Sequence, residues 1–321
     1  MKCYKKDYPR PQFVRDNWVN LNGTWDFGFD DENCGEKEAW YEKFAGNRQI
    51  QVPFTYETSL SGIGEEEIHE NVWYRRSFTA KGEELCKKRL LLHFEGSDFI
   101  TKVWVNGSFA GSHRGGYSRF SFDVTELVKD GENELVVKVE DSTDIHQPRG
   151  KQRWIKENFA CWYVQTTGIW KTVWMEYVPK ISLDSVKITP VLTDNAVELE
   201  YEIKGDSACL GEELLVEAVV SFDGMFVAKS VSAMTASHVR TVLDVSGTGE
   251  NAFVWGVRTW SPEEPDLYDI SFRVLYKGEV QDEVGSYFGM REIRIDGPNI
   301  LLNGRPLYQR LILDQGYWKD S

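Results

Sequence analysis

Apolar and polar residues alternate along most of this chain, and this period of two limits its fold more than any other feature. Residues 197–204 (VELEYEIK) place an apolar side chain at every second position, with charged side chains between them. Successive side chains of a β-strand point to opposite faces of the sheet, so this pattern predicts strands with one buried face. Before Pro179, only Thr125–Leu127 indicates a helical turn, with Thr125 as its N-cap. We therefore expect an all-β protein.

Two groups of strands are separated at Pro179. Upstream of it, many short strands with little helix predict a β-sandwich or a barrel. Residues 169–178 are apolar on both faces and predict a central strand that is covered on both sides. From Ile181 onward, about seven strands favour an immunoglobulin-like sandwich.

The last part of the sequence predicts a third piece. Asn303-Gly304 is a favoured hairpin turn because both positions tolerate positive φ. The apolar run Arg310–Leu313 that follows is typical of a fully buried strand. Such a strand needs neighbours, and none follow it, so we expect the first strand of a further domain and a chain that is a fragment. Without those neighbours, residues 310–318 should be disordered, packed on the preceding domain or paired with another chain.

Charge and cysteine usage narrow the partners and the compartment. The formal net charge is −14 and the pI is about 5.0, which argues against nucleic acid and anionic membranes as partners. The five cysteines are scattered and odd in number, which indicates reduced thiols. The N-terminus lacks the apolar region of a signal peptide, and no run is long enough to span a bilayer. We expect a cytoplasmic protein.

No self-contained catalytic motif is visible. The five histidines lack metal-ligand spacing, and there is no nucleophile elbow or phosphate loop. The acidic runs Glu65–Glu67 and Glu263-Glu264 are typical of solvated loops. We expect no catalytic residue, no metal and no cofactor in this chain.

Several stretches carry family-specific motifs. In the first 180 residues they are 21–27 (LNGTWDF), 93–98 (HFEGSD), 103–107 (VWVNG) and 167–174 (TGIWKTVW). Together these resemble the N-terminal sugar-binding domain of glycoside hydrolase family 2, which holds β-galactosidases, β-glucuronidases and β-mannosidases. Residues 254–268 resemble the immunoglobulin-like domain of that family, and 302–306 (LNGRP) resemble its lead into a (β/α)₈ barrel.

The resemblance implies where the domains begin and end and where the catalytic residues of the intact enzyme would lie. Residues 1–180 would form a jelly-roll sugar-binding domain, 181–296 an immunoglobulin-like sandwich and 297–321 the truncated start of the barrel. The family's two catalytic glutamates lie on later barrel strands, so this chain would be the non-catalytic N-terminal part of a retaining β-glycosidase. Its partner would be a β-glycoside in the intact enzyme.

The resemblance also suggests residues near the sugar. Family members often carry a sugar-binding carboxylate shortly before the pair Gly168-Ile169, but this sequence has none there. Two aromatic residues could stack on sugar instead, or pack in the core; they are Trp162 and Tyr163. Asp314 and Gln315 follow the first barrel strand, where the family places substrate contacts. The basic loop that holds Arg149 and Lys151 could reach the barrel mouth or form a surface loop with salt bridges.

The sequence is also compatible with two other functions. One is a stand-alone carbohydrate-binding module, because jelly-roll sandwiches commonly bind sugars. The other is a structural or oligomerisation unit, and a homo-oligomer is possible. The sequence leaves open which glycoside is the substrate.

Overall fold

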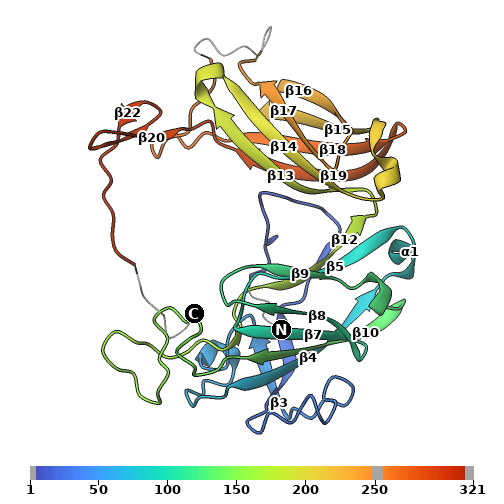
Figure 1. Ribbon diagram of the computed structural model, residues 1–321, viewed down its shortest axis with the longest axis vertical. Helices are drawn as coiled ribbons and strands as arrows, with labels where there is room; N and C mark the ends of the chain where they lie inside the picture. Colours follow the sequence, from blue (N-terminus) through green and yellow to red (C-terminus); the bar gives the residue numbers. More distant parts are fainter. Residues whose placement is uncertain (1–4, 248–255, 315–321) are drawn as a thin grey trace. The chain divides into compact units, whose positions relative to one another are not determined.

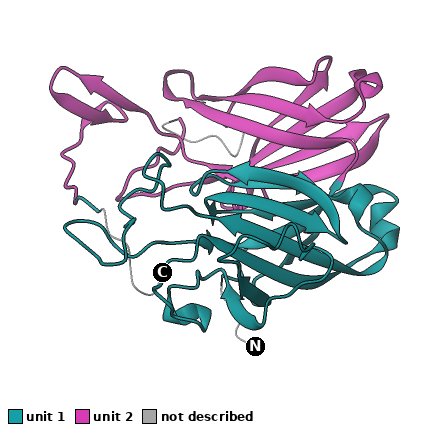
Figure 2. Ribbon diagram, turned by 60° about the horizontal axis from the view of Figure 1, so that its bottom comes forward, with its two compact units in different colours: residues 1–9, 17–178, 313–321 teal, residues 10–16, 179–312 magenta. Residues whose placement is uncertain are grey.

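The computed structural model describes residues 5–247 and 256–314, and strands dominate it (Figure 1). The chain divides into two compact units (Figure 2). Unit 1 contains residues 1–9, 17–178 and 313–321, and unit 2 contains residues 10–16 and 179–312. The all-β class expected from the alternating pattern is confirmed.

Unit 1 is a sandwich of two sheets with a common core. The six-stranded sheet has the order β3 (Arg48–Val52), β2 (Gly23–Phe29), β4 (Asn71–Ala80), β10 (Gly131–Glu140), β7 (Ile100–Val105) and β8 (Ser108–Arg114). The four-stranded sheet has the order β1 (Trp18–Asn20), β12 (Val173–Pro179), β5 (Lys88–Phe94) and β9 (Phe120–Asp123). A short pair joins β6 (Ser97–Asp98) to β11 (Gly168–Ile169). The helical turns are η1 (Ser59–Ser61), α1 (Gly82–Leu85) and η2 (Thr125–Leu127).

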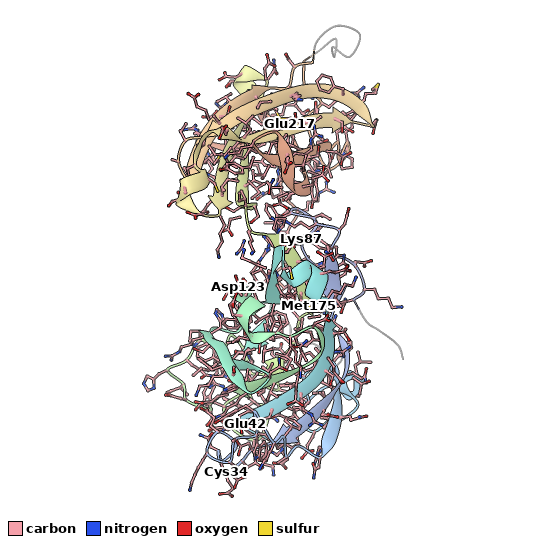
Figure 3. The ribbon with its side chains drawn as sticks, turned by 90° about the vertical axis from the view of Figure 1, so that its right-hand side faces the viewer. Cys34, Glu42, Lys87, Asp123, Met175 and Glu217 are labelled. Atoms are coloured by element: carbon pink, nitrogen blue, oxygen red, sulfur yellow. The ribbon has the colours of Figure 1, made fainter. Side chains whose placement is uncertain are left out.

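The core of unit 1 lies between these two sheets. Strand β10 pairs with both β4 and β7, and its inner residues Leu135, Val137 and Val139 are buried. On β12, Met175 is buried in the same core and is labelled in Figure 3. Residues 173–178 of β12 are all buried, which confirms a covered strand. The strand begins at Val173 and not at Ile169 as predicted, because Ile169 pairs in β11.

Unit 2 contains a three-stranded and a four-stranded sheet. The first has the order β13 (Ser182–Val191), β14 (Ala196–Lys204) and β17 (His238–Asp244). The second has the order β16 (Met225–Met234), β15 (Gly211–Phe222), β18 (Tyr268–Tyr276) and β19 (Glu279–Phe288). Single turns η3 (Leu192–Asp194) and η4 (Ser207–Cys209) flank β14. The alternating apolar residues of 197–204 all lie in the core, as predicted, and the strand set fits an immunoglobulin-like sandwich.

A short N-terminal segment belongs to unit 2, although unit 1 surrounds it in sequence. Val14 pairs with Gly285 of β19 through two backbone hydrogen bonds of 2.8 and 2.9 Å. Arg15 donates two hydrogen bonds to the carboxylate of Asp282, at 3.0 and 2.8 Å, and a third to the carbonyl of Leu183. We call residues 10–16 the strap. The sequence pattern did not predict it.

The hairpin predicted at Asn303-Gly304 is confirmed, but the strand predicted after it is not formed. A small sheet contains β20 (Ile293–Asp296), β21 (Asn299–Leu302) and β22 (Arg305–Pro306). Residues 310–314 are in no strand, and Leu311, Ile312 and Leu313 are 78%, 91% and 82% exposed. Of the outcomes expected for residues 310–318, packing on the preceding domain is not seen for residues 311–313, because their side chains are exposed and no described strand pairs with them. That these residues begin a barrel in a longer protein stays a prediction. Residues 315–318 of the predicted segment lie outside the described residues.

Candidate functional site

The connection between β10 and β11, which we call the 141–167 loop, carries four of the residues predicted to lie near a sugar. They are Arg149, Lys151, Trp162 and Tyr163. Other members of this connection are polar and buried, which is unusual for a surface loop and requires hydrogen-bond partners within the protein.

Arg149 links parts of the loop to one another through hydrogen bonds. Its guanidinium is buried and donates hydrogen bonds to the carbonyls of Ser142 and Asp144, at 2.6 and 2.8 Å. Lys151 is half-buried, and its carbonyl accepts a hydrogen bond of 2.8 Å from the backbone of Tyr163. The role of Arg149 seen here is structural, and a substrate contact by either residue stays a prediction.

A second buried arginine, Arg153, joins the loop to the segment that precedes β4. Its Nε donates to Gln165 Oε1 at 2.9 Å, and its Nη2 donates to the carbonyl of Glu66. Gln165 Nε2 in turn donates to the carbonyl of Glu67 at 3.2 Å and to the Tyr56 hydroxyl at 3.3 Å. No sequence pattern singles out Arg153 and Gln165, because polar side chains in a connection between strands are expected to be solvent-exposed.

The outer part of the loop presents aromatic rings. Trp162 packs edge-on against Trp154, with ring centroids 4.7 Å apart, and Trp154 packs in the same way against Phe159 at 5.2 Å. Trp162 stays half-buried and Tyr163 is exposed. The rings therefore support one another and keep part of their surface open. Flat apolar rings of this kind can stack on the C–H faces of a sugar.

Three buried carboxyl groups, one of them on the first residue of the loop, accept hydrogen bonds from loop residues. We call Glu57, Asp98 and Asp141 the carboxyl cluster. Glu57 Oε1 accepts from the backbone N–H of Thr167 at 3.0 Å, and Asp141 Oδ2 accepts from the hydroxyl of the same residue at 2.8 Å. Asp98 Oδ2 accepts from Gln152 Nε2 at 2.8 Å. The cluster therefore fixes both ends of the segment that carries the aromatic rings.

Burial keeps these carboxyl groups protonated to an unusually high pH. Loss of hydration raises the pKa of Glu57 to about 8, that of Asp98 to about 7 and that of Asp141 to about 6. The negative charge of Asp141 raises the pKa of the other two further. All three side chains are buried, and the hydrogen bonds described above link them to the loop.

Two predicted site residues remain, and both lie at the end of the sequence. Asp314 is exposed and belongs to no strand, and Gln315 lies outside the described residues. Within residues 5–247 and 256–314, no three His, Cys, Asp or Glu side chains group as metal ligands would. The helices found in the same residues are all too short to cross a membrane.

Comparison with known proteins places these features in a family. The family description "Glycosyl hydrolases family 2, sugar binding domain" matches residues 18–179, and "Glycosyl hydrolases family 2" matches residues 181–291. The first match contains the 141–167 loop and the carboxyl cluster, and the second covers the immunoglobulin-like sandwich.

Two curated relatives align along nearly the whole chain. A β-galactosidase of Thermoanaerobacter pseudethanolicus is 27% identical over 91% of this chain and 36% of its own length. A putative β-glucuronidase of Formosa agariphila is 28% identical over 94% of this chain and 35% of its own length. The chain thus spans about a third of the length of these relatives.

Solved structures share the fold. A β-glucuronidase from Ruminococcus gnavus superimposes with a TM-score of 0.73 at 22% identity, over 94% of this chain and 49% of that one. At this identity the likeness concerns the fold alone. The family matches cover the larger part of the sequence, and the chain belongs to glycosyl hydrolases family 2.

Proposed function

We propose that this chain forms the non-catalytic, sugar-binding part of a β-glycoside hydrolase whose bond-cleaving carboxylates lie outside it. The relatives are named β-galactosidase or β-glucuronidase, and the chain spans about a third of their length. Cleavage with retention requires two opposed carboxyl groups that reach the substrate. The carboxyl cluster is buried and hydrogen-bonded to the 141–167 loop, which supports a structural role for it.

The observation that carries this proposal is the aromatic face of the 141–167 loop. Trp162 lies in the domain that matches the family's sugar-binding description, and buried hydrogen bonds hold its loop in place. A preorganised aromatic face loses little conformational entropy when a sugar stacks on it. The loop would form one wall of the substrate pocket, with the wall opposite supplied by the rest of the enzyme.

A titration of the isolated chain tests this role. Calorimetry with methyl β-galactoside and methyl β-glucuronide should show weak binding of one of them, because only one wall is present. Trp162→Ala should weaken that binding by about tenfold, the effect of losing roughly 1.4 kcal/mol of stacking. Phe109→Ala removes an exposed ring of β8 outside the loop and should leave binding unchanged. Equal binding by the Trp162 variant would refute the role given to the loop.

The same preparation tests the absence of catalysis. We expect no release of nitrophenol from aryl β-galactosides or β-glucuronides beyond that of a mock purification. Glu57→Gln serves as the internal check, because turnover that disappears with this substitution would assign catalysis to the chain itself. Tight binding of sugar without turnover would instead favour the stand-alone carbohydrate-binding module.

We further propose a cytoplasmic location and, as a separate hypothesis, a homo-oligomer. Cys34, Cys86, Cys161 and Cys209 are free thiols, which supports a reducing compartment. Light scattering of the purified chain checks the oligomeric state.

A further inference from the structure

The carboxyl cluster has two oxygens that are buried and accept no hydrogen bond from the described residues. They are Asp98 Oδ1 and Glu57 Oε2, on side chains that are 2% and 7% exposed. The backbone closes directly over the first of them, since a Cβ added to Gly116 would lie 2.2 Å from Asp98 Oδ1. An ionised carboxylate with a buried, unpaired oxygen is costly, whereas a neutral carboxyl group tolerates the same setting better.

Negative charges around the cluster also favour the neutral acids, and one positive charge opposes them. Asp141 faces both Glu57 and Asp98, and Glu70 adds negative charge beside Asp141. Arg149 supplies positive charge to Asp98 and Asp141, although its guanidinium is engaged with loop carbonyls. The buried hydroxyls of Tyr56 and Tyr74 lie near Glu57 and carry no charge at neutral pH. Ionisation of all three acids would therefore place like charges together with limited compensation.

Each acid of the cluster accepts a hydrogen bond from a loop residue, either in the middle of the loop or at its C-terminal end. Glu57 and Asp141 both bind Thr167, the last residue before β11, while Asp98 binds Gln152 in the middle of the loop. Gln152 Oε1 in turn accepts a hydrogen bond of 2.6 Å from the backbone of Thr166. Repulsion within the cluster would thus act directly on the bonds that hold the loop closed.

We propose that the carboxyl cluster is a proton-operated latch, which holds the 141–167 loop closed while its acids are neutral and loosens it when they ionise. The latch goes beyond the proposed function. Only its consequence for sugar rests on that function, since a loosened loop would no longer preorganise Trp162.

The direction of the pH dependence follows from the raised pKa values. In the open loop the acids would titrate near their ordinary pKa values, about 4, whereas in the closed loop the pKa values are about 8, 7 and 6. The closed state therefore binds more protons, so its stabilisation is full below about pH 4 and is lost as the pH rises through the closed-state values. The closed loop is therefore most stable at acidic pH and becomes less stable at mildly alkaline pH.

Hydrogen exchange of the purified chain without any ligand tests the latch. Protection factors, which are corrected for the intrinsic pH dependence of exchange, should fall at least about tenfold for the loop amides between about pH 5 and about pH 9. The amides of Thr167 and Tyr163 report the loop, and those of β4 serve as the internal reference. Loop protection that does not change with pH, relative to β4, would overturn the proposal.

Two variants separate the latch from a general effect of pH. Glu57→Gln with Asp98→Asn keeps the hydrogen-bond acceptors but removes two ionisations, and the fall in protection should shrink severalfold. Asp26→Asn removes a half-exposed carboxylate paired with Arg75 on the six-stranded sheet and should leave the fall unchanged. The same fall in the double variant as in wild type would also overturn the latch.

If the double variant does not fold, Asp98→Asn alone should still reduce the fall. The pH dependence of the loop protection factors in the wild-type chain also tests the proposal without any variant. Because no sugar is present, the result is independent of whether the chain binds one, so failure of the latch and failure of the proposed function are distinguishable.

Discussion

At the scale of the residue, buried polar side chains organise the candidate site. Arg153 contacts Gln165 and Asn158 within its own loop, and it also contacts the carbonyl of Glu66 in the segment that precedes β4. A buried guanidinium is tolerated only when such partners satisfy it, because its hydration is lost. The conformation of the loop therefore depends on a few specific hydrogen bonds.

Removing Arg153 should destabilise unit 1. Arg153→Ala would leave Gln165 Oε1 without its donor and would leave the Glu66 carbonyl with only the longer bond from Gln165 Nε2. We expect a cost of about 3 kcal/mol in the free energy of unfolding. Urea denaturation followed by tryptophan fluorescence measures this cost. As the matched control, Lys88→Ala breaks the partly exposed pair with Glu84 and should cost less than about 1 kcal/mol. Similar costs for both variants would contradict the role given to Arg153.

At the scale of the element, the connection between β2 and β3 covers the outer face of the six-stranded sheet. It places Tyr41 flat against Trp104, with centroids 5.3 Å apart, and Trp104 stacks in turn on Trp73 at 5.4 Å. Lys138 of β10 is 3% exposed on this face, and its Nζ donates to Glu36 at 2.9 Å and to Asn33 at 2.6 Å. A face that the alternating pattern assigns to solvent is thus buried.

The pair formed by Glu36 and Lys138 should hold this connection in place. Glu36→Ala leaves a buried ammonium group with less compensation, and we expect a loss of about 2 kcal/mol, because Asn33 remains and Glu36 itself is half-exposed. The control is Glu42→Ala on the same connection, which is exposed and is labelled in Figure 3 together with Cys34. Thermal unfolding distinguishes the two. A midpoint that is equally unchanged in both variants would show that the pair is dispensable.

At the scale of the whole molecule, the chain does not divide into units by a single cut. The strap belongs to unit 2, yet residues 5–9 and 17–178 on either side of it belong to unit 1. Its anchor is a buried ion pair, because Arg15 and Asp282 are 6% and 2% exposed. A boundary read from the sequence at residue 180 therefore separates unit 2 from one of its own segments.

Arg15→Met should destabilise unit 2 through the charge that it leaves behind. An unpaired, buried Asp282 is expected to cost about 3–5 kcal/mol, seen by calorimetry as a lower unfolding temperature for unit 2. The double variant Arg15→Met, Asp282→Asn removes that charge and should recover part of the loss. No recovery in the double variant would mean that the strap acts by packing alone.

A fragment of residues 179–312, which lacks the strap, should be less stable than the same unit in the full chain.

The sequence by itself determined the features that depend on neighbouring residues. Alternation in residues 197–204 predicts which face of β14 is buried, and the Asn-Gly pairs predict the hairpin turns, because pleat and turn geometry are local. The family motifs are short stretches of neighbouring residues, and they predicted the two sandwiches. Trp162 and Tyr163 were singled out in the same way.

Only the tertiary structure decided which polar groups are buried and which strands find partners. Arg15 and Asp282 are 267 positions apart, and Glu57 meets Thr167 across 110 positions, so no local pattern reveals either contact. For the same reason the apolar run at 310–313, which looks like a buried strand, forms none in the described structure. A charge or a strand is stable inside a protein only when distant residues satisfy it, and the order of the residues does not state which ones do.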